Sequence, residues 1–219
     1  MVSTGRRGSY AVGRDRRERI LDAASARFTH EGYSQTSMAE IAREVGITGP
    51  GLAHHFPTKQ HLLLALAERR FDLANERAHA AAPEAADGTA TLRRALAVAE
   101  LFAAQPDLMQ LFVLVTAEAA DPQSAAHALY AARYERVIDD LAAQFADEVE
   151  AGLLRDDLDY REIARECIAV ADGLQLQWVL SGGAIDTVAL ARAHFERLAP
   201  HLLRSGASVD LSAPALPAA

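Results

Sequence analysis

The sequence predicts an all-α fold of about nine helices, in which a three-helix N-terminal unit precedes a larger helical body. Apolar residues recur at three- and four-residue spacing along most of the chain. No run alternates between apolar and polar residues over the length of a strand. Glycines and prolines fall between the periodic segments, as they do between helices. Half of the 219 residues are hydrophobic, which is enough for a sizeable core.

The first predicted helix runs from Arg14 to Glu31, because Ile20, Ala24 and Phe28 recur at four-residue spacing. Gly32 can supply the left-handed residue that ends it. Residues 1–13, rich in Gly, Ser and Arg, are expected to form a flexible basic arm. Its arginines could follow the backbone of a nucleic acid, or the arm could be an uninvolved terminus.

Two short helices follow. Ser37 and Glu40 have the spacing of a capping box, and Gly46 can end the helix that they begin. Thr48 can cap a third helix over about 49–55, where Pro50 is tolerated in the first turn.

Thr58 can cap a long fourth helix over 59–81, and residues 82–88 are expected to be a loop. Further helices are predicted over 89–104, 107–120, 124–152, 160–181 and 186–204. Residues 205–219 are expected to be a disordered tail. The expected domains are therefore 14–58 and 59–204.

Charge is unevenly distributed. Residues 1–61 hold nine Lys/Arg and six Asp/Glu, a net charge of +3, whereas residues 62–219 hold thirteen and twenty-four, a net charge of −11. A basic head on an acidic body favours phosphate contact by the head alone.

Residues 37–56 have the layout of a helix-turn-helix. Ala42 is small where a second helix must cross closely, and Gly46 makes the turn. Ile41, Val45 and Leu52 can hold the crossing, which leaves the outer face of the second helix free for the major groove of DNA. A plain corner between two core helices is the alternative interpretation.

Residues 32–64 resemble the TetR family of transcriptional regulators. The matching residues are Gly32, Tyr33, Thr36, Ile41, Ala42, Gly46, Ile47, Thr48, Leu52, Phe56, Lys59 and Leu62. One position departs from the family pattern, since Ala53 replaces an aromatic residue that contacts the DNA backbone. The resemblance implies a ligand-responsive repressor that binds palindromic operator DNA as a homodimer and is released by a small-molecule effector.

The expected DNA contacts divide into two groups. Thr36, Ser37 and Lys59 lie at helix starts, where free N–H groups or a full charge suit phosphate. The third helix is expected to contact the base edges and their surroundings, through Thr48, Gly49, Pro50, Gly51, His54 and His55.

The resemblance also implies an effector cavity among the middle helices. The candidate lining residues are Phe102, Met109, Phe112, Thr116, Glu118, Tyr134, Gln175 and Trp178. In the family the last two helices form the dimer interface. The candidate surface here is an apolar stripe of Ile163, Cys167, Ala171, Leu174 and Trp178, with Val188, Leu190, Ala191 and Phe195 on the final helix.

No cofactor or metal is expected, because the eight histidines lack the spacing or cysteine partners of a zinc site. The single Cys167 suits core packing better than redox sensing, and fits a cytoplasmic protein without a membrane span. Two other functional classes stay open, an enzyme with a helical fold and a helical interaction module that has lost DNA binding. No nucleophile and base pair or phosphate loop favours the enzyme.

Overall fold

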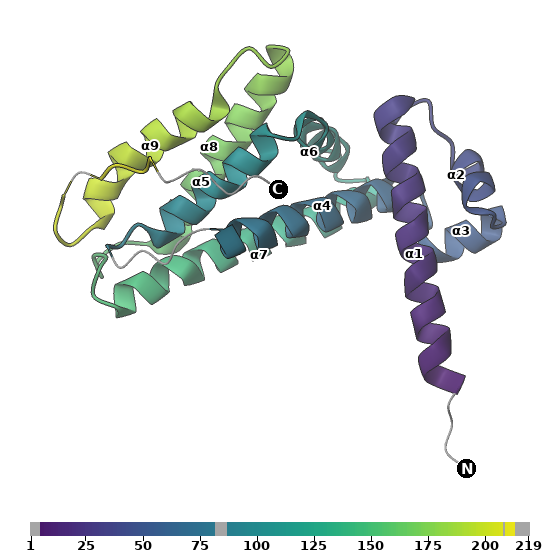
Figure 1. The fold of residues 1–219 in the computed structure, drawn as a ribbon, viewed down its shortest axis with the longest axis horizontal. Helices are drawn as coiled ribbons and strands as arrows, with labels where there is room; N and C mark the ends of the chain where they lie inside the picture. Colours follow the sequence, from purple (N-terminus) through teal and green to yellow (C-terminus); the bar gives the residue numbers. More distant parts are fainter. Residues whose placement is uncertain (1–4, 82–86, 208, 213–219) are drawn as a thin grey trace.

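The computed structural model describes residues 5–81, 87–207 and 209–212. In these residues the chain forms the expected all-α fold of nine helices (Figure 1). Their bounds are α1 Gly5–His30, α2 Met38–Val45, α3 Gly49–His55, α4 Lys59–Ala81, α5 Ala90–Ala103, α6 Pro106–Ala119, α7 Ala125–Glu150, α8 Tyr160–Leu180 and α9 Thr187–Leu202.

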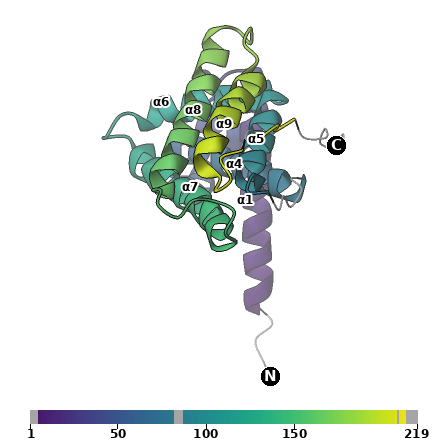
Figure 2. The same ribbon diagram turned by 90° about the vertical axis from the view of Figure 1, so that its left-hand side faces the viewer.

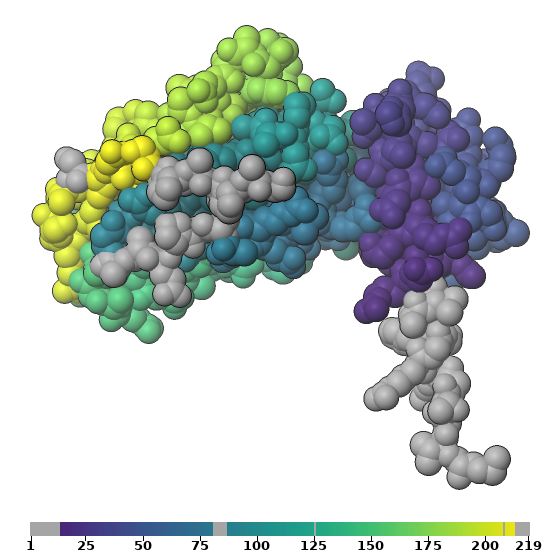
Figure 3. Space-filling view, viewed as in Figure 1, coloured from purple at the N-terminus to yellow at the C-terminus, as the bar shows by residue number. Residues whose placement is uncertain are grey.

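The helices are arranged in two parts joined by α4. Helices α1 to α3 form the N-terminal unit, and α5 to α9 form the body, with α4 running from one into the other (Figure 1). The N-terminal unit stands out as a separate lobe on the molecular surface (Figure 3). Helices α8 and α9 pack side by side across the body (Figure 2).

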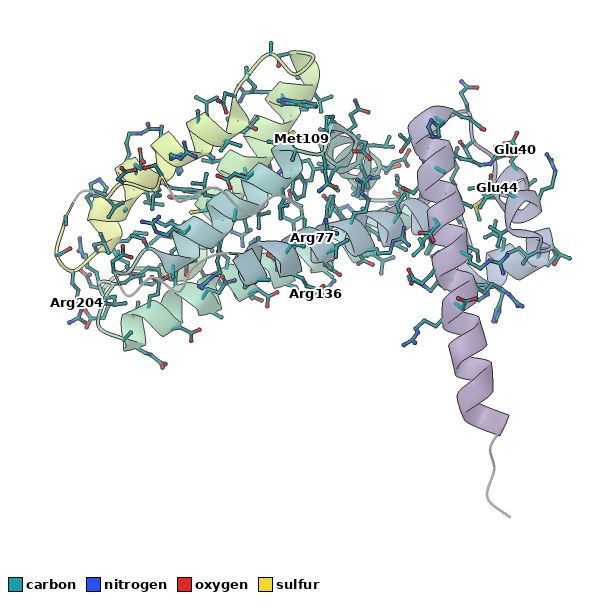
Figure 4. All side chains as sticks on the ribbon, in the orientation of Figure 1. Glu40, Glu44, Arg77, Met109, Arg136 and Arg204 are labelled. Atoms are coloured by element: carbon teal, nitrogen blue, oxygen red, sulfur yellow. The ribbon has the colours of Figure 1, made fainter. Side chains whose placement is uncertain are left out.

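The helix ends of the N-terminal unit follow the sequence prediction. Ser37 caps α2 in a complete capping box, in which its backbone N–H donates to Glu40 Oε2 over 2.8 Å (Figure 4 labels Glu40). Gly46 ends the helix in the left-handed conformation, with φ 73°. Thr48 then caps α3, and its side chain accepts the Gly51 N–H. These local rules fix the turn between α2 and α3.

Two expected unstructured segments are corrected by the structure. Helix α1 begins at Gly5, so residues 5–13 are helical and not a flexible arm; the side chains of this segment lie outside the described residues. Residues 209–212 pack on the body, because Leu211 is fully buried and its N–H donates to Glu196.

A single apolar cluster links the N-terminal unit to the body. It includes Ile20, Ile41 and Leu52 from the N-terminal unit, and it continues through Leu62 and Phe71 of α4 into α5, α6 and α7. A second cluster joins α5, α7, α8, α9 and Leu211. The N-terminal unit therefore shares its core with the body and cannot move without repacking α4.

Helix α5 has an N-terminal cap that is distant in sequence. Its own N-cap residue, Thr89, makes no side-chain capping bond. Instead Glu148, buried near the end of α7, accepts the N–H groups of Ala90 and Thr91 over 3.2 and 2.9 Å. A carboxylate at this position also interacts favourably with the positive end of α5.

We expect Glu148→Ala to lower the free energy of unfolding by about 2–3 kcal/mol, because two buried N–H groups lose their acceptor. Glu148→Gln keeps one oxygen acceptor and is expected to cost less. Urea denaturation of the two variants measures the difference. Equal stability of the alanine variant and the wild type would contradict the capping role.

Candidate DNA interface and effector cavity

Helix α3 presents most of the expected base-reading residues on one exposed side. Thr48, Gly49, Pro50 and His54 are exposed, and Gly51 and His55 are partly exposed. Leu52 and Phe56 are buried beneath them and hold the helix against α2 and α1. The structure therefore brings this predicted group together.

Two histidines and two arginines meet beside the end of α3. The rings of His54 and His55 lie edge to face, with centroids 5.6 Å apart. Burial lowers the pKa of His55, and the positive charges of His54, Arg16 and Arg17 lower it further. Arg17 also lies 5.1 Å above the Phe56 ring. Helix α1 thus adds cationic groups that sequence spacing could not connect to α3.

Thr36 does not offer its side chain to phosphate. The residue is 1% exposed, and its hydroxyl donates to the Gly32 carbonyl over 3.0 Å. Ser37 is exposed, but its hydroxyl donates to Glu40 in the capping box. The two hydroxyls are therefore engaged within the protein, and the start of α2 already carries the Glu40 carboxylate, while a phosphate contact by the backbone N–H groups of this helix start stays a prediction.

The Lys59 ammonium group points into the protein. It donates to the carbonyl oxygens of Tyr33 and Thr36 over 2.8 and 3.0 Å, and it lies 4.4 Å from the centre of the Tyr33 ring. These contacts tie the start of α4 to the segment between α1 and α2. These bonds favour a structural role for Lys59, in which the side chain fixes the segment between α1 and α2 to α4, over the expected phosphate contact.

We expect Lys59→Met to lower the free energy of unfolding by about 1–2 kcal/mol and to leave the salt dependence of DNA binding unchanged. The matched variant is Arg16→Met, which removes an exposed charge beside α3. It should keep its stability and reduce the salt slope by about one phosphate. Thermal melting and binding titrations over a range of salt concentrations measure both effects. The opposite pattern, a smaller salt slope of DNA binding for Lys59→Met with unchanged melting, would show that Lys59 contacts a phosphate.

The body contains a cavity of about 490 Å³ between α4, α5, α6, α7, α8 and α9. Four of the predicted lining residues lie on its wall, namely Phe102, Phe112, Tyr134 and Gln175. Phe71, Tyr130 and Asp172 also line it. The rings of Phe71 and Phe102 are stacked at 5.4 Å, which makes one side of the cavity aromatic.

Four predicted lining residues lie elsewhere. Met109, on α6, is 1% exposed and packs in the core (Figure 4). Trp178 packs next to Gly183, whose added Cβ would lie 3.2 Å from the indole. Thr116 is exposed and bonds Tyr130, while Glu118 lies partly exposed near Tyr33. None of the four is on the cavity wall.

Asp172 is a charged residue of the cavity wall that the sequence analysis did not predict. Its carboxylate accepts a hydrogen bond from the Tyr134 hydroxyl. Desolvation by burial raises the pKa of Asp172 to about 6, although the bond from Tyr134 opposes the rise. Among the described residues no cationic group lies within 4.0 Å of it. At neutral pH the cavity therefore carries a mostly ionised, unpaired carboxylate.

Two other pairs of charges on the wall lie between α4 and α7. Arg133 binds Asp72 over 2.8 Å, and Arg136 lies 3.8 Å from Glu68 (Figure 4 labels Arg136). Both pairs join α7 to α4. The two ion pairs position α4, and the opposite charges within each pair neutralise one another. Asp172 therefore remains as a charge without a counterion in this part of the cavity.

The candidate dimer stripe is partly internal. Cys167 and Phe195 are 3% and 2% exposed, and both line the cavity. Burial raises the pKa of the Cys167 thiol to about 12, which keeps it protonated. Leu190 of the predicted stripe is exposed, and so are two leucines of α8 outside it, Leu176 and Leu180. A helical stripe cannot by itself distinguish packing within one subunit from packing between two.

In the part of the chain that the structure describes, no three metal-ligating side chains come together. No single described helix is both long and apolar enough to cross a membrane, although α5 and α6, bent by 101°, pass that test as a pair.

An exposed recognition helix and a ligand-sized cavity on one chain define a helix-turn-helix protein with a sensor-like body. Comparison with known proteins gives its family. Residues 20–66 match the family described as "Bacterial regulatory proteins, tetR family", and residues 89–204 match "BetI-type transcriptional repressor, C-terminal". The chain belongs to the TetR family of bacterial regulators, and its body is of the BetI type.

Individual relatives match either the N-terminal unit or the whole fold. The transcriptional activator FasR of Mycolicibacterium smegmatis is 40% identical over 67 residues, 31% of either chain, so the chain spans about a third of that curated relative's length. A regulator from Saccharomonospora viridis, solved with choline, is 27% identical, with a TM-score of 0.63 over 86% of this chain and 97% of that one. The FadR repressor of Thermus thermophilus, solved with lauroyl-CoA, shares the fold at 23% identity, with a TM-score of 0.67 over 92% of this chain and 100% of that one.

Proposed function

We propose that this protein is a homodimeric repressor that binds palindromic operator DNA through α3 and releases it when a small organic cation occupies the cavity. The observation that carries the choice of effector is the carboxylate of Asp172, which is partly buried on the cavity wall and has no cationic partner among the described residues. The expected division into a DNA-binding domain at 14–58 and an effector and dimerisation domain at 59–204 belongs to the same proposal.

The N-terminal unit supports the DNA-binding step. Its exposed side combines the α3 residues with the cationic side chains of Arg16 and Arg17. Gly49 and Gly51 let the backbone approach the DNA closely, and Thr48 and Pro50 offer apolar contacts to thymine methyl groups. His54 and His55 can donate to phosphate or to base acceptors.

The cavity supports a cationic effector. An ionised carboxylate out of water is stabilised by an opposite charge close to it. The rings of Phe71, Phe102, Tyr130 and Tyr134 can face a cation as well. The Gln175 Oε1 atom, also buried, has no hydrogen-bond partner among the described residues and would accept from a ligand donor. The relative from S. viridis was solved with choline, a compound of this class.

Helix α4 offers a route from the cavity to the DNA. Phe71 lines the cavity, and three neighbouring residues form ion pairs with three different helices. Arg69 binds Glu18 and Asp22 of α1, Arg70 binds Asp107 of α6, and Asp72 binds Arg133 of α7. A ligand that alters the cavity wall therefore acts on the helix that carries Lys59 at its other end.

A dimer is required by the short reading helix, because one α3 reaches too few base pairs for useful specificity. Leu176 and Leu180 on α8 and Leu190 on α9 are exposed. Two copies that meet through α8 and α9 would bury these leucines. The two α3 helices would then need to lie about 34 Å apart to enter successive major grooves of the DNA.

We expect choline to weaken binding of the wild-type protein to the DNA upstream of its gene, and Asp172→Asn to abolish that response while keeping DNA binding. As the pH falls through about 6, Asp172 takes up a proton, so choline binding should weaken about tenfold per pH unit below it.

The raised pKa also means that ionised Asp172 disfavours folding above about pH 6. The Asn variant should therefore melt higher than the wild type at pH 7.5 and no higher at pH 3.

Mobility-shift assays and calorimetry measure these effects, with Asp140→Asn as the control at an exposed lining carboxylate. An unchanged choline response in Asp172→Asn would reject Asp172 as the cation site. A wild-type protein that fails to bind the upstream DNA would favour an interaction module or an enzyme over a repressor.

We expect Leu176→Glu to convert the protein to monomers at micromolar concentration and to weaken operator binding. The matched control is Leu73→Glu on α4, because Leu73 and Leu176 are 46% and 44% exposed. Analytical ultracentrifugation measures the mass of each variant. A dimeric Leu176→Glu variant, or a monomeric wild type, would contradict the proposed interface.

A further inference from the structure

A second charged side chain on the cavity wall lacks an opposite charge. Arg94 of α5 is partly buried and lines the cavity. Its guanidinium donates to Gln144 Oε1 over 2.8 Å and to Thr91 Oγ1 over 3.2 Å. Both acceptors are neutral. No carboxylate among the described residues lies within 4.0 Å of Arg94.

The acidic residues in its neighbourhood are engaged or exposed. Glu148 accepts two backbone N–H groups at the start of α5. Asp140 lies one turn before Gln144 and is exposed to solvent. A guanidinium has five N–H donors, and the two recorded bonds use two of them. Arg94 can therefore present a charged, multidentate donor to a ligand in the cavity.

Arg94 and Asp172 lie at different levels of the cavity. Arg94 is bonded to Gln144 and Asp172 to Tyr134, and both of these residues line the cavity from α7. Ten residues separate them, which corresponds to about 15 Å along a helix. An unpaired cation and an unpaired anion thus face one cavity at two separate levels.

We propose that Arg94 forms a second, oxyanion-binding subsite, so that the effector is a dipolar organic ion with its cationic end at Asp172 and its oxyanion at Arg94. This inference rests on the proposed function, because it extends the cation site to a second contact. It narrows the effector class to elongated molecules, because the α7 residues that bond the two charged groups lie roughly 15 Å apart along the helix. A guanidinium suits this task because its planar donors match a carboxylate or a phosphate.

The test uses synthetic ω-trimethylammonio alkanoates of increasing chain length, each compared with its methyl ester. The ester has the same length and the same cation but no anionic end. We expect the wild-type protein to bind the acid about tenfold or more tightly than the ester, and only when the chain is long enough to bridge the two levels. Isothermal titration calorimetry measures the two affinities.

Arg94→Gln should remove the preference for the acid and leave ester binding unchanged. Arg93→Gln makes the same change on the same helix at a residue outside the cavity wall and should keep the preference. Asp172→Asn should weaken the binding of the acid and of the ester by the same factor. If Arg94→Gln fails to fold, the comparison of acid and ester in the wild type still decides the proposal.

The outcomes separate the two proposals. Equal affinity of acid and ester at every length would overturn the Arg94 subsite and leave the cation effector standing. A preference for the acid that survives Arg94→Gln would overturn it too. If neither the acid, the ester nor choline binds, the cation effector fails and the subsite fails with it. A phosphonate series in place of the carboxylates shows which oxyanion binds more tightly.

Discussion

The burial of α4 is the constraint on which the rest of the structure depends. Leu62 and Phe71 belong to one apolar cluster that begins in the N-terminal unit and ends at the cavity. Close-packed clusters respond to a change by moving between discrete arrangements, because voids are costly. Lys59 fixes one end of α4 to the DNA-facing segment, and the ion pair of Asp72 with Arg133 fixes it to α7 near the cavity. The two functional regions are therefore coupled by packing, and polar contacts fix the position of α4 relative to each of them.

The parts of the structure that local rules determine could be predicted from the sequence. The capping box at Ser37, the left-handed Gly46 and the cap at Thr48 each depend on a few neighbouring residues, and all three are present. The contacts of Lys59 could not be predicted in this way, because its ammonium group donates to the carbonyl of Tyr33, which lies 26 residues away and is brought near only by the folded chain.

The cavity could be predicted only in outline, because its walls come from helices that are distant in the sequence. Aromatic residues on two predicted helices indicated Phe102 and Phe112, and both line it. Asp172 carried no such signal, since a single acidic residue in a helix is normally solvated. Its importance follows from burial and from Tyr134, which lies 38 residues away in the chain. Leu176 and Phe195 show the same limit, because the pattern of α8 and α9 does not say which face is covered within the subunit.

The carboxylate of Asp172 is partly buried without a cationic partner among the described residues, which makes its side of the cavity a high-energy feature. The desolvation that raises the pKa of Asp172 is a free-energy cost of folding. A cationic ligand removes part of that cost, and it favours whichever arrangement of the walls brings the carboxylate nearest to it. Because Tyr134 on α7 holds this carboxylate, and Arg133 beside it holds α4, a change in preferred wall arrangement is also a change in the position of α4. In the proposed mechanism DNA and effector compete through this one shared helix, and linkage requires each to weaken the binding of the other by the same factor.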